Sequence, residues 1–166
     1  MRARRRYARR QGRADVRIRR VQPADLEALL QLCREHAAFE GATYVEHGQR
    51  QALPAALFGA APALHGWVVE GDSELAGYMT ATLDYATWDA RRFVHMDCLY
   101  LRPAYRRAGL GRRFIEELRR FAAAQGCAEI QWQTPADNAD AIAFYRRIGA
   151  RGKAKQRFLL DVGTPA

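Results

Sequence analysis

Apolar positions recur along the chain with two different periods, which separate the helices from the strands. Spacings of three and four residues predict helices over residues 22–40, 49–58, 109–125 and 138–149. Alternating or short continuous apolar runs predict strands over residues 16–21, 64–70, 74–85, 92–101, 128–134 and 156–162. Helices and strands in this order are typical of an α/β fold.

The strand at 92–101 is the predicted centre of the sheet. It is apolar on both faces apart from His95 and Asp97, as expected of a strand that is covered from both sides. Helix 109–125 and strand 128–134 follow it and complete a predicted parallel unit, while the two strands before it form a predicted hairpin. We therefore expect a mixed central sheet of about six to seven strands flanked by about four helices.

Length and charge predict one folded domain with a basic extension. The chain has 166 residues, 49% of them hydrophobic, which is enough for one core but not for two. The formal net charge is +9, and residues 1–14 hold seven arginines and no acid, which leaves +2 for the rest. We expect residues 1–15 to form a flexible tail, either solvated or in contact with nucleic acid or another acidic surface, and residues 16–166 to form the domain.

The remaining composition argues against several classes of protein. No apolar run approaches the roughly 18 residues of a membrane span, and the basic extension lacks the apolar core of a secretory signal. Cys33, Cys98 and Cys127 form no CxxC pair and lie within apolar segments, which predicts reduced, buried thiols in a cytoplasmic protein. The four histidines show no HxxxH or HExxH spacing, so no metal site is expected.

The segment PAYRRAGLGRRFIEEL, at 103–118, places a basic, glycine-containing loop directly before a helix. Amides at a helix N-terminus are unpaired and carry partial positive charge, so a loop with little side chain there suits a phosphate or pyrophosphate. The spacing Arg106-x-x-Gly109-x-Gly111 is not that of a GxxxxGK(S/T) loop, and a GxGxxG loop would need glycine where Phe114 stands. Taken alone, the two glycines fit an ordinary turn equally well.

Two motifs together carry a resemblance to a known family. CLYLRPAYRRAGLGRRFIEEL is followed further along by NADAIAFYRRIGA, and the pair resembles the two signatures of the GNAT N-acetyltransferases in order and separation. The resemblance covers roughly residues 16–162. It implies the GNAT fold and transfer of an acetyl group from acetyl-CoA to an amine. Within the family, FYRRIGA, HMDCLYLRPAYR and the FE that ends the first helix are most similar to diamine (spermidine/spermine, thialysine) acetyltransferases.

The resemblance implies a coenzyme site along the central strand, the loop and the last helix. The loop amides would hold the pyrophosphate, and the side chains of Arg106 and Arg112 would add contacts to phosphate. The backbone of the strand before the loop would pair with the pantetheine and polarise the thioester carbonyl. Asn138 would hydrogen-bond the pantetheine arm, although asparagine also suits a helix N-cap, and both roles can hold at once. The implied coenzyme residues are Leu99, Tyr100, Leu101, Arg106, Arg107, Ala108, Gly109, Leu110, Gly111, Arg112, Asn138 and Tyr145.

The resemblance also implies a general acid and a general base. Tyr145, which follows Phe144 in the second motif, would protonate the departing coenzyme thiolate; a half-buried structural aromatic is the alternative. An amine must lose a proton before it attacks the thioester, and Asp97 stands where diamine acetyltransferases have the glutamate that serves as base. Aspartate is one methylene shorter, so a water would be needed more, and Asp97 could instead only hold a backbone group or the substrate ammonium.

Cys98 invites a second mechanism, in which a cysteine is acetylated first. Strand alternation predicts that Cys98 lies on the face opposite Asp97, and no histidine or cation is identifiably paired with it. We therefore interpret Cys98 as a buried core residue. Direct transfer from thioester to amine in a ternary complex is the expected mechanism.

An acceptor site is expected around the first helix and around the connection that follows the hairpin. Carboxylates beside an aromatic side chain suit a cationic amine through ion pairing and cation–π contact, although these acids could equally belong to a solvated surface. The candidate residues are Glu35, Glu40, Glu46, Asp84, Trp88, Asp89 and Asp97.

The preferred acceptor is a small cationic amine, namely a polyamine, a diamine or the amine of an amino acid. The sequence leaves open an aminoglycoside antibiotic, a protein or peptide amine, and a non-catalytic acyl-CoA-binding module whose tail binds nucleic acid. Asp97 and Tyr145 favour the enzyme, because a binding module does not need both. Members of the family are often dimers, so a homodimer is a further expectation, and no membrane partner is expected.

Overall fold

The computed structural model describes residues 16–71 and 73–163. The predicted basic tail, residues 1–15, lies outside the described residues. The chain divides into two compact units, one ending at Gln133 and the other beginning at Thr134.

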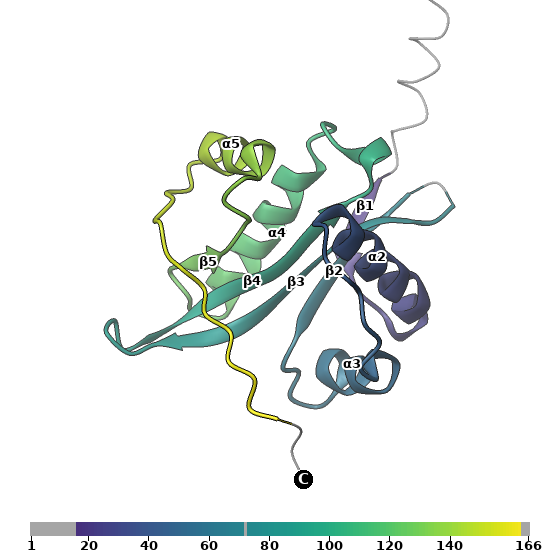
Figure 1. Ribbon diagram of the computed structural model, residues 1–166, viewed down its shortest axis with the longest axis horizontal. Helices are drawn as coiled ribbons and strands as arrows, with labels where there is room; N and C mark the ends of the chain where they lie inside the picture. The colour runs from purple at the N-terminus through teal and green to yellow at the C-terminus, as the bar shows by residue number, and fades with distance from the viewer. Residues whose placement is uncertain (1–15, 72, 164–166) are drawn as a thin grey trace, which may run out of the picture. The chain divides into compact units, whose positions relative to one another are not determined.

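The first unit contains a mixed sheet whose strands follow one another in space as they do in the chain (Figure 1). Each of the first three pairs of neighbours is antiparallel, and the last pair, β4 and β5, is parallel. The predicted hairpin and the predicted parallel unit are therefore confirmed. Within the described residues the strands are β1 (Arg17–Arg20), β2 (His65–Glu70), β3 (Leu75–Ala86), β4 (Arg91–Leu101) and β5 (Ile130–Trp132).

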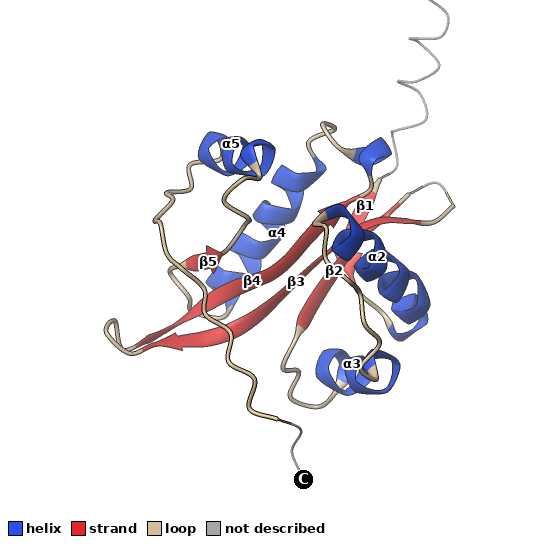
Figure 2. Cartoon of the chain, in the orientation of Figure 1, coloured by secondary structure: helices blue, strands red, loops and turns tan. Residues whose placement is uncertain are grey.

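Helices cover both faces of this sheet, as Figure 2 shows. Val68 and Trp67 are neighbours in β2 and therefore point to opposite faces. Val68 belongs to the core formed with α2 (Leu26–Phe39) and α3 (Gln49–Phe58). Trp67 packs edge-on against Phe121 of α4 (Leu110–Ala124) at 5.2 Å between ring centroids. The second unit holds α5 (Ala139–Arg147), so the four predicted helices are confirmed.

A buried ion pair fixes the start of α2. Asp25 accepts two hydrogen bonds from the Arg19 guanidinium, at 2.6 and 2.9 Å, and a third from the Gln22 amide at 2.7 Å. The Arg19 guanidinium holds the pKa of Asp25 below its usual range. The pair ties β1 to the turn that begins α2, the helix that carries Glu35 and is followed directly by Glu40.

The predicted strand at 156–162 is wrong, and the described sheet has five strands where six to seven were expected. Residues 151–163 form neither helix nor strand. Their large apolar side chains are 85–89% exposed; these are Phe158, Leu159, Leu160 and Val162. Apolar periodicity reports which side chains favour burial, but a strand also needs a neighbouring backbone with which to pair. No such backbone pairs with this segment among the described residues.

Candidate active site

The loop between β4 and α4 leads directly into the N-terminus of the helix. Arg107 has φ 60° and Gly109 has φ 80°, so two residues of this short loop are left-handed. Gly109 is the N-cap of α4, and no side chain caps the first turn. Left-handed turns that lead into a helix N-terminus gather backbone amides around a concave surface suited to an anion. The loop therefore fits a pyrophosphate group, and its own residues would hold it mainly through amides.

Replacing Gly109 by alanine is expected to weaken acetyl-CoA binding about tenfold, measured by titration calorimetry. A Cβ at this φ costs roughly 1–2 kcal/mol, so the altered loop relaxes and binding must restore its shape. Gly126, at φ 68° beyond the other end of α4, is a matched control, because a Cβ at either glycine meets no atom within 4 Å. An equal loss of affinity in Gly126→Ala would contradict a specific role for the loop.

The two arginines expected to reach phosphate are placed differently. Arg112 is exposed on the first turn of α4, 3.7 Å from Glu116. Arg106 turns back toward β4, where its Nε donates to the Leu101 carbonyl at 2.7 Å. The Arg106 guanidinium also lies 4.0 Å from the centroid of the Phe39 ring at the end of α2. Arg112 therefore stays close to the loop, whereas Arg106 joins the loop to α2.

Asp97 lies on a β-bulge in the strand that leads to this loop. Thr80 pairs with Cys98 and Ala81 pairs with Met96, so Asp97 is an extra residue in β4. Its side chain is exposed, contrary to the expectation of an acid enclosed in an apolar strand. Its Oδ2 atom is 3.5 Å from both the Thr80 hydroxyl and the Cys98 sulfur.

The bulge also corrects the predicted orientation of Cys98. Strict alternation would put the side chains of Asp97 and Cys98 on opposite faces, but a bulge interrupts alternation, and the Cys98 sulfur approaches the Asp97 carboxylate. Burial, together with the negative charge of Asp97, raises the pKa of Cys98 to about 12. A thiol with this pKa is protonated at neutral pH and is a poor nucleophile, in agreement with our interpretation against a cysteine intermediate.

One edge of β4 is open beyond the bulge. β5 pairs with β4 only from Val94 to Met96, whereas β4 continues to Leu101. Leu99, Tyr100 and Leu101 pair with β3 on one side, and in the described part of the chain no strand pairs with them on the other. Backbone groups that are unpaired on a strand edge can bind an extended ligand, and here the Leu101 carbonyl is already occupied by Arg106 Nε. Leu99, Tyr100 and Leu101 are the residues expected to pair with the pantetheine arm.

A cluster of polar side chains that the sequence did not single out lies beside Asp97, on the face of the sheet covered by α2. His36 of α2 contacts the Tyr78 hydroxyl of β3 through Nδ1 at 2.9 Å, and its ring stacks on Tyr100 at 5.2 Å. Burial lowers the pKa of His36 and raises that of Tyr78 far above its usual value. His36 follows Cys33, a residue of the apolar stripe of this helix, by three positions. Residues three apart share a helix face, so this spacing could have predicted that His36 points toward the core.

Two of the predicted acceptor acids are already paired with arginines. Glu35 accepts two hydrogen bonds from Arg102, both 2.9 Å, and Glu46 accepts one from Arg34 at 2.6 Å. These acids therefore contribute little free negative charge. Glu40, at the end of α2, instead faces His36 Nε2 at 3.3 Å.

The acceptor residues predicted on the hairpin lie away from Asp97. Asp84 pairs in the sheet with Phe93, four residues before Asp97 in β4, which is roughly 13 Å along a strand. Trp88 is 99% exposed in the turn between β3 and β4, and Asp89 is its exposed neighbour. The structure therefore does not gather these side chains with Glu35 into a single acidic pocket.

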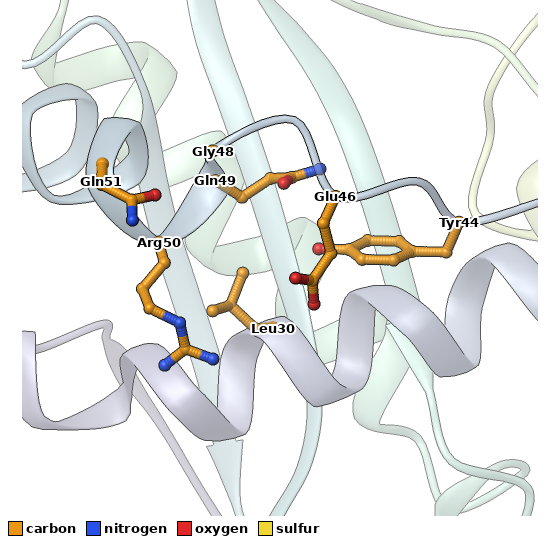
Figure 3. Close-up of a pocket in the computed structure, with 7 residues that line it drawn as sticks. All are labelled: Leu30, Tyr44, Glu46, Gly48, Gln49, Arg50 and Gln51. Atoms are coloured by element: carbon orange, nitrogen blue, oxygen red, sulfur yellow. The ribbon is translucent and has the colours of Figure 1, made fainter.

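A pocket of about 270 Å³ lies between α2, α3 and their connection (Figure 3). Tyr44 and Glu46 from the connection, Arg50 from α3 and Leu30 from α2 line it. Its charged groups are already paired, Glu46 with Arg34 and Arg50 with Glu27. No residue of β4 lines it, so this pocket does not contain the proposed base.

The second unit carries the remaining candidate residues on α5. The Asn138 carboxamide oxygen accepts the Ala141 amide at 3.1 Å, so Asn138 caps the helix, as the simpler interpretation expected. The nitrogen of the same carboxamide remains the donor that would serve a coenzyme. Tyr145 is half-buried, and its ring is 5.2 Å from that of Phe144.

The part of the chain that the structure describes shows no disulfide, no metal centre and no helix that could span a membrane. Cys33, Cys98 and Cys127 are all free thiols, and only Cys127 is fully buried. Across residues 16–71 and 73–163, no group of three or more histidine, cysteine or acidic side chains is arranged to hold a metal ion. The described helices are also too short or too polar to span a membrane.

Comparison with known proteins places this chain in a family. The sequence matches the family described as Acetyltransferase (GNAT) family over residues 29–150. Thialysine N-epsilon-acetyltransferase of Mus musculus is 30% identical over 146 residues, covering 83% of this chain and 85% of the relative. L-ornithine N5-acetyltransferase NATA1 of Arabidopsis thaliana is 26% identical over 80 residues, covering 48% of this chain and 35% of the relative.

Solved structures share the fold at lower identity. An aminoglycoside acetyltransferase, meta-AAC0020, from an uncultured soil metagenomic sample matches with a TM-score of 0.76 at 18% identity, covering 89% of this chain and 97% of that one. A second solved structure is AAC(6')-Iy in complex with the bisubstrate analogue CoA-S-monomethyl-acetylneamine. It matches with a TM-score of 0.72 at 18% identity, covering 89% of this chain and 99% of that one. The predicted α/β fold and the stated resemblance are confirmed. The chain belongs to the acetyltransferase (GNAT) family and is an N-acetyltransferase that uses acetyl-CoA as its acetyl donor.

Proposed function

We propose that this enzyme acetylates the terminal amine of a small cationic molecule, such as a basic amino acid, a diamine or a polyamine. The observation that carries the proposal is the Asp97 carboxylate, which is exposed on a bulge in the strand that leads to the coenzyme loop. No lysine or arginine pairs with it among the described residues. Two relatives support the choice, because their names specify the N-epsilon group of thialysine and the N5 group of ornithine.

The charge around Asp97 also favours an acceptor with few positive charges. Arg102 and Arg34 neutralise Glu35 and Glu46, so Asp97 and Glu40 remain as the acids available near the coenzyme strand. Two carboxylates match one or two ammonium groups better than the larger number on an aminoglycoside. Asp84, Trp88 and Asp89 on the hairpin would contact only the distal part of a long acceptor.

Each group of residues has a separate task in the proposed mechanism. The loop from Arg107 to Gly111 holds the pyrophosphate, and the open edge of β4 orients the pantetheine. Bound acetyl-CoA supplies the acetyl thioester. Asp97 removes a proton from the acceptor ammonium so that the amine nitrogen can attack, and Tyr145 donates a proton to the departing thiolate sulfur.

A turnover screen tests this function. Release of free coenzyme A thiol is measured with acetyl-CoA and a panel that contains thialysine, ornithine, lysine, putrescine, spermidine, aminoglycosides and lysine-containing peptides. The highest kcat/KM is expected for a basic amino acid or a diamine. A preference for aminoglycosides or peptides would overturn the proposed acceptor, and binding of acetyl-CoA without turnover of any amine would favour a non-catalytic module.

The organisation of the molecule outside this site stays a prediction. A single domain over residues 16–166, a homodimer, a cytoplasmic location and contact of the basic tail with nucleic acid all rest on sequence alone. Light scattering in solution would test the homodimer.

A further inference from the structure

Arg106, at the start of the coenzyme loop, has its side chain held by two other elements. Its Nε atom donates to the Leu101 carbonyl at the end of β4, at 2.7 Å. Its guanidinium lies 4.0 Å from the centroid of the Phe39 ring, at the last position of α2, and 5.6 Å from that of the Tyr100 ring in β4. The side chain therefore contacts β4 and α2, while its backbone belongs to the loop.

The Leu101 carbonyl lies on the open edge of β4. Leu101 stands opposite Gly77 of β3. The amide of the next residue, Arg102, donates to the Ala76 carbonyl at 2.9 Å. In an antiparallel ladder this pattern marks a pair whose own amides and carbonyls point away from the partner strand. The Leu101 carbonyl therefore points away from β3, and Arg106 Nε closes the loop end of this edge.

The Arg106 cation is matched by rings and not by an acid. Arg19 and Arg102 each bind carboxylates, but Arg106 has no carboxylate partner in residues 16–71 and 73–163. A guanidinium is planar and forked, so one face can stack on a ring while an edge donates to a carbonyl. A phosphate that drew the guanidinium away would break both contacts.

Phe39 and Tyr100 extend this contact into the body of the first unit. Their ring centroids are 6.2 Å apart, and Tyr100 stacks in turn on His36 at 5.2 Å. Tyr100 is 6% exposed, whereas Phe39, at the end of α2, is 53% exposed. The row of rings is therefore anchored in the core at Tyr100 and reaches the coenzyme loop at Arg106.

We propose that Arg106 is a positioning residue, which holds the coenzyme loop against the end of α2 and supports acetyl-CoA binding through this contact. Arg107, the first left-handed residue of the loop, follows it directly, so fixing Arg106 fixes where the loop turns. The amides that receive the pyrophosphate are then in place before the coenzyme arrives, which lowers the cost of ordering them on binding. The resemblance implied a direct contact of the Arg106 side chain with phosphate, and the two roles lead to different expectations.

Replacement by lysine separates the two roles. Arg106→Lys keeps the charge that a phosphate contact needs but loses the forked hydrogen bond and the flat stacking surface. We expect Arg106→Lys and Arg106→Gln to weaken acetyl-CoA binding equally, about tenfold by titration calorimetry, as for one lost hydrogen bond to a charged group. An affinity in Arg106→Lys closer to that of the unaltered enzyme than to that of Arg106→Gln would overturn the proposal.

Arg112 is the matched control, because it is an arginine beside the same loop without these contacts. It is exposed on the first turn of α4, 3.7 Å from Glu116. Arg112→Lys should retain the original affinity, and any loss in Arg112→Gln should shrink at high salt, since exposed charges are screened. The loss in the Arg106 variants should be the same at low and high salt. A loss in Arg106→Gln that shrinks at high salt would indicate a phosphate contact instead.

A double-mutant cycle with Phe39 tests the contact itself. Phe39→Leu changes no charge and should weaken acetyl-CoA binding about threefold, as expected for a partly exposed cation–π contact. Adding it to Arg106→Lys should cause no further loss, because both changes remove the same contact. Adding it to Arg112→Gln should multiply the two single losses. Losses that multiply in the Arg106 pair would show that Arg106 acts without Phe39 and would contradict the proposal.

Thermal unfolding separates positioning from a role in stability. If Arg106 only stabilised the fold, its variants would unfold at a lower temperature while the folded protein kept the original acetyl-CoA affinity, and the proposal would fail. If Arg106→Gln does not fold, Arg106→Lys carries the same expectations, at both salt concentrations and in the cycle with Phe39. None of these measurements involves an amine, so their outcome is independent of the proposed acceptor.

Discussion

Replacing Asp97 by asparagine is expected to lower kcat/KM for the amine about 100-fold or more at neutral pH. The variant keeps the shape of the side chain, and Asp97 is exposed on a bulge with only long contacts to Thr80 and Cys98, so the fold and acetyl-CoA affinity should be retained. Only the ability to take a proton from the ammonium is removed. Thiol release and titration calorimetry measure the two properties separately.

The pH dependence of Asp97→Asn gives a second test of the base. A primary amine titrates near pH 10.4, so its neutral fraction rises about tenfold per pH unit around neutrality. Without a base, the enzyme can use only acceptor molecules that are already deprotonated in solution. The rate should therefore rise about tenfold per pH unit, in proportion to the neutral fraction of the amine. Glu129→Gln removes an equally exposed carboxylate beside β5 and should behave like the original enzyme. Loss of acetyl-CoA binding in Asp97→Asn would instead indicate a structural role.

Replacing Tyr145 by phenylalanine is expected to lower kcat about 100-fold, because the departing thiolate would leave without a proton donor. The ring and its packing beside Phe144 are retained, so α5 should remain intact. Steady-state thiol release measures the effect, and Tyr85→Phe, on an exposed tyrosine of β3, is the control. Acetyl thioesters of more acidic thiols need less help on departure and should lose less. A loss below tenfold would contradict the role of general acid.

Local patterns predicted much of this fold because the interactions that decide it are close in the sequence. The amphipathic stripe of α4 and the N-cap of α5 depend on residues three or four positions apart. The glycine at position 109 marked a turn directly before the helix, where the structure has a left-handed residue. These features could be stated before any tertiary contact was known.

The features that the sequence did not reveal depend on pairing between distant segments. The bulge at Asp97 exists only relative to β3, so alternation within β4 gave the wrong face for Cys98. Glu35 is neutralised by an arginine 67 residues away, and His36 meets a tyrosine 42 residues away. Residues 151–163 show the reverse. Their apolar pattern is that of a strand, but no strand of the described residues pairs with them.

The bulge in β4 also has a consequence for how the acceptor preference of this enzyme could be changed. An extra residue in a strand has no partner of its own across the ladder, so its side chain can be exchanged without altering the register of the sheet. Asp97 is therefore a position of β4 where the length of an acidic side chain can be changed with little disturbance of the scaffold. Asp97→Glu would move the proposed base toward or away from an acceptor by one methylene while the coenzyme loop stays fixed.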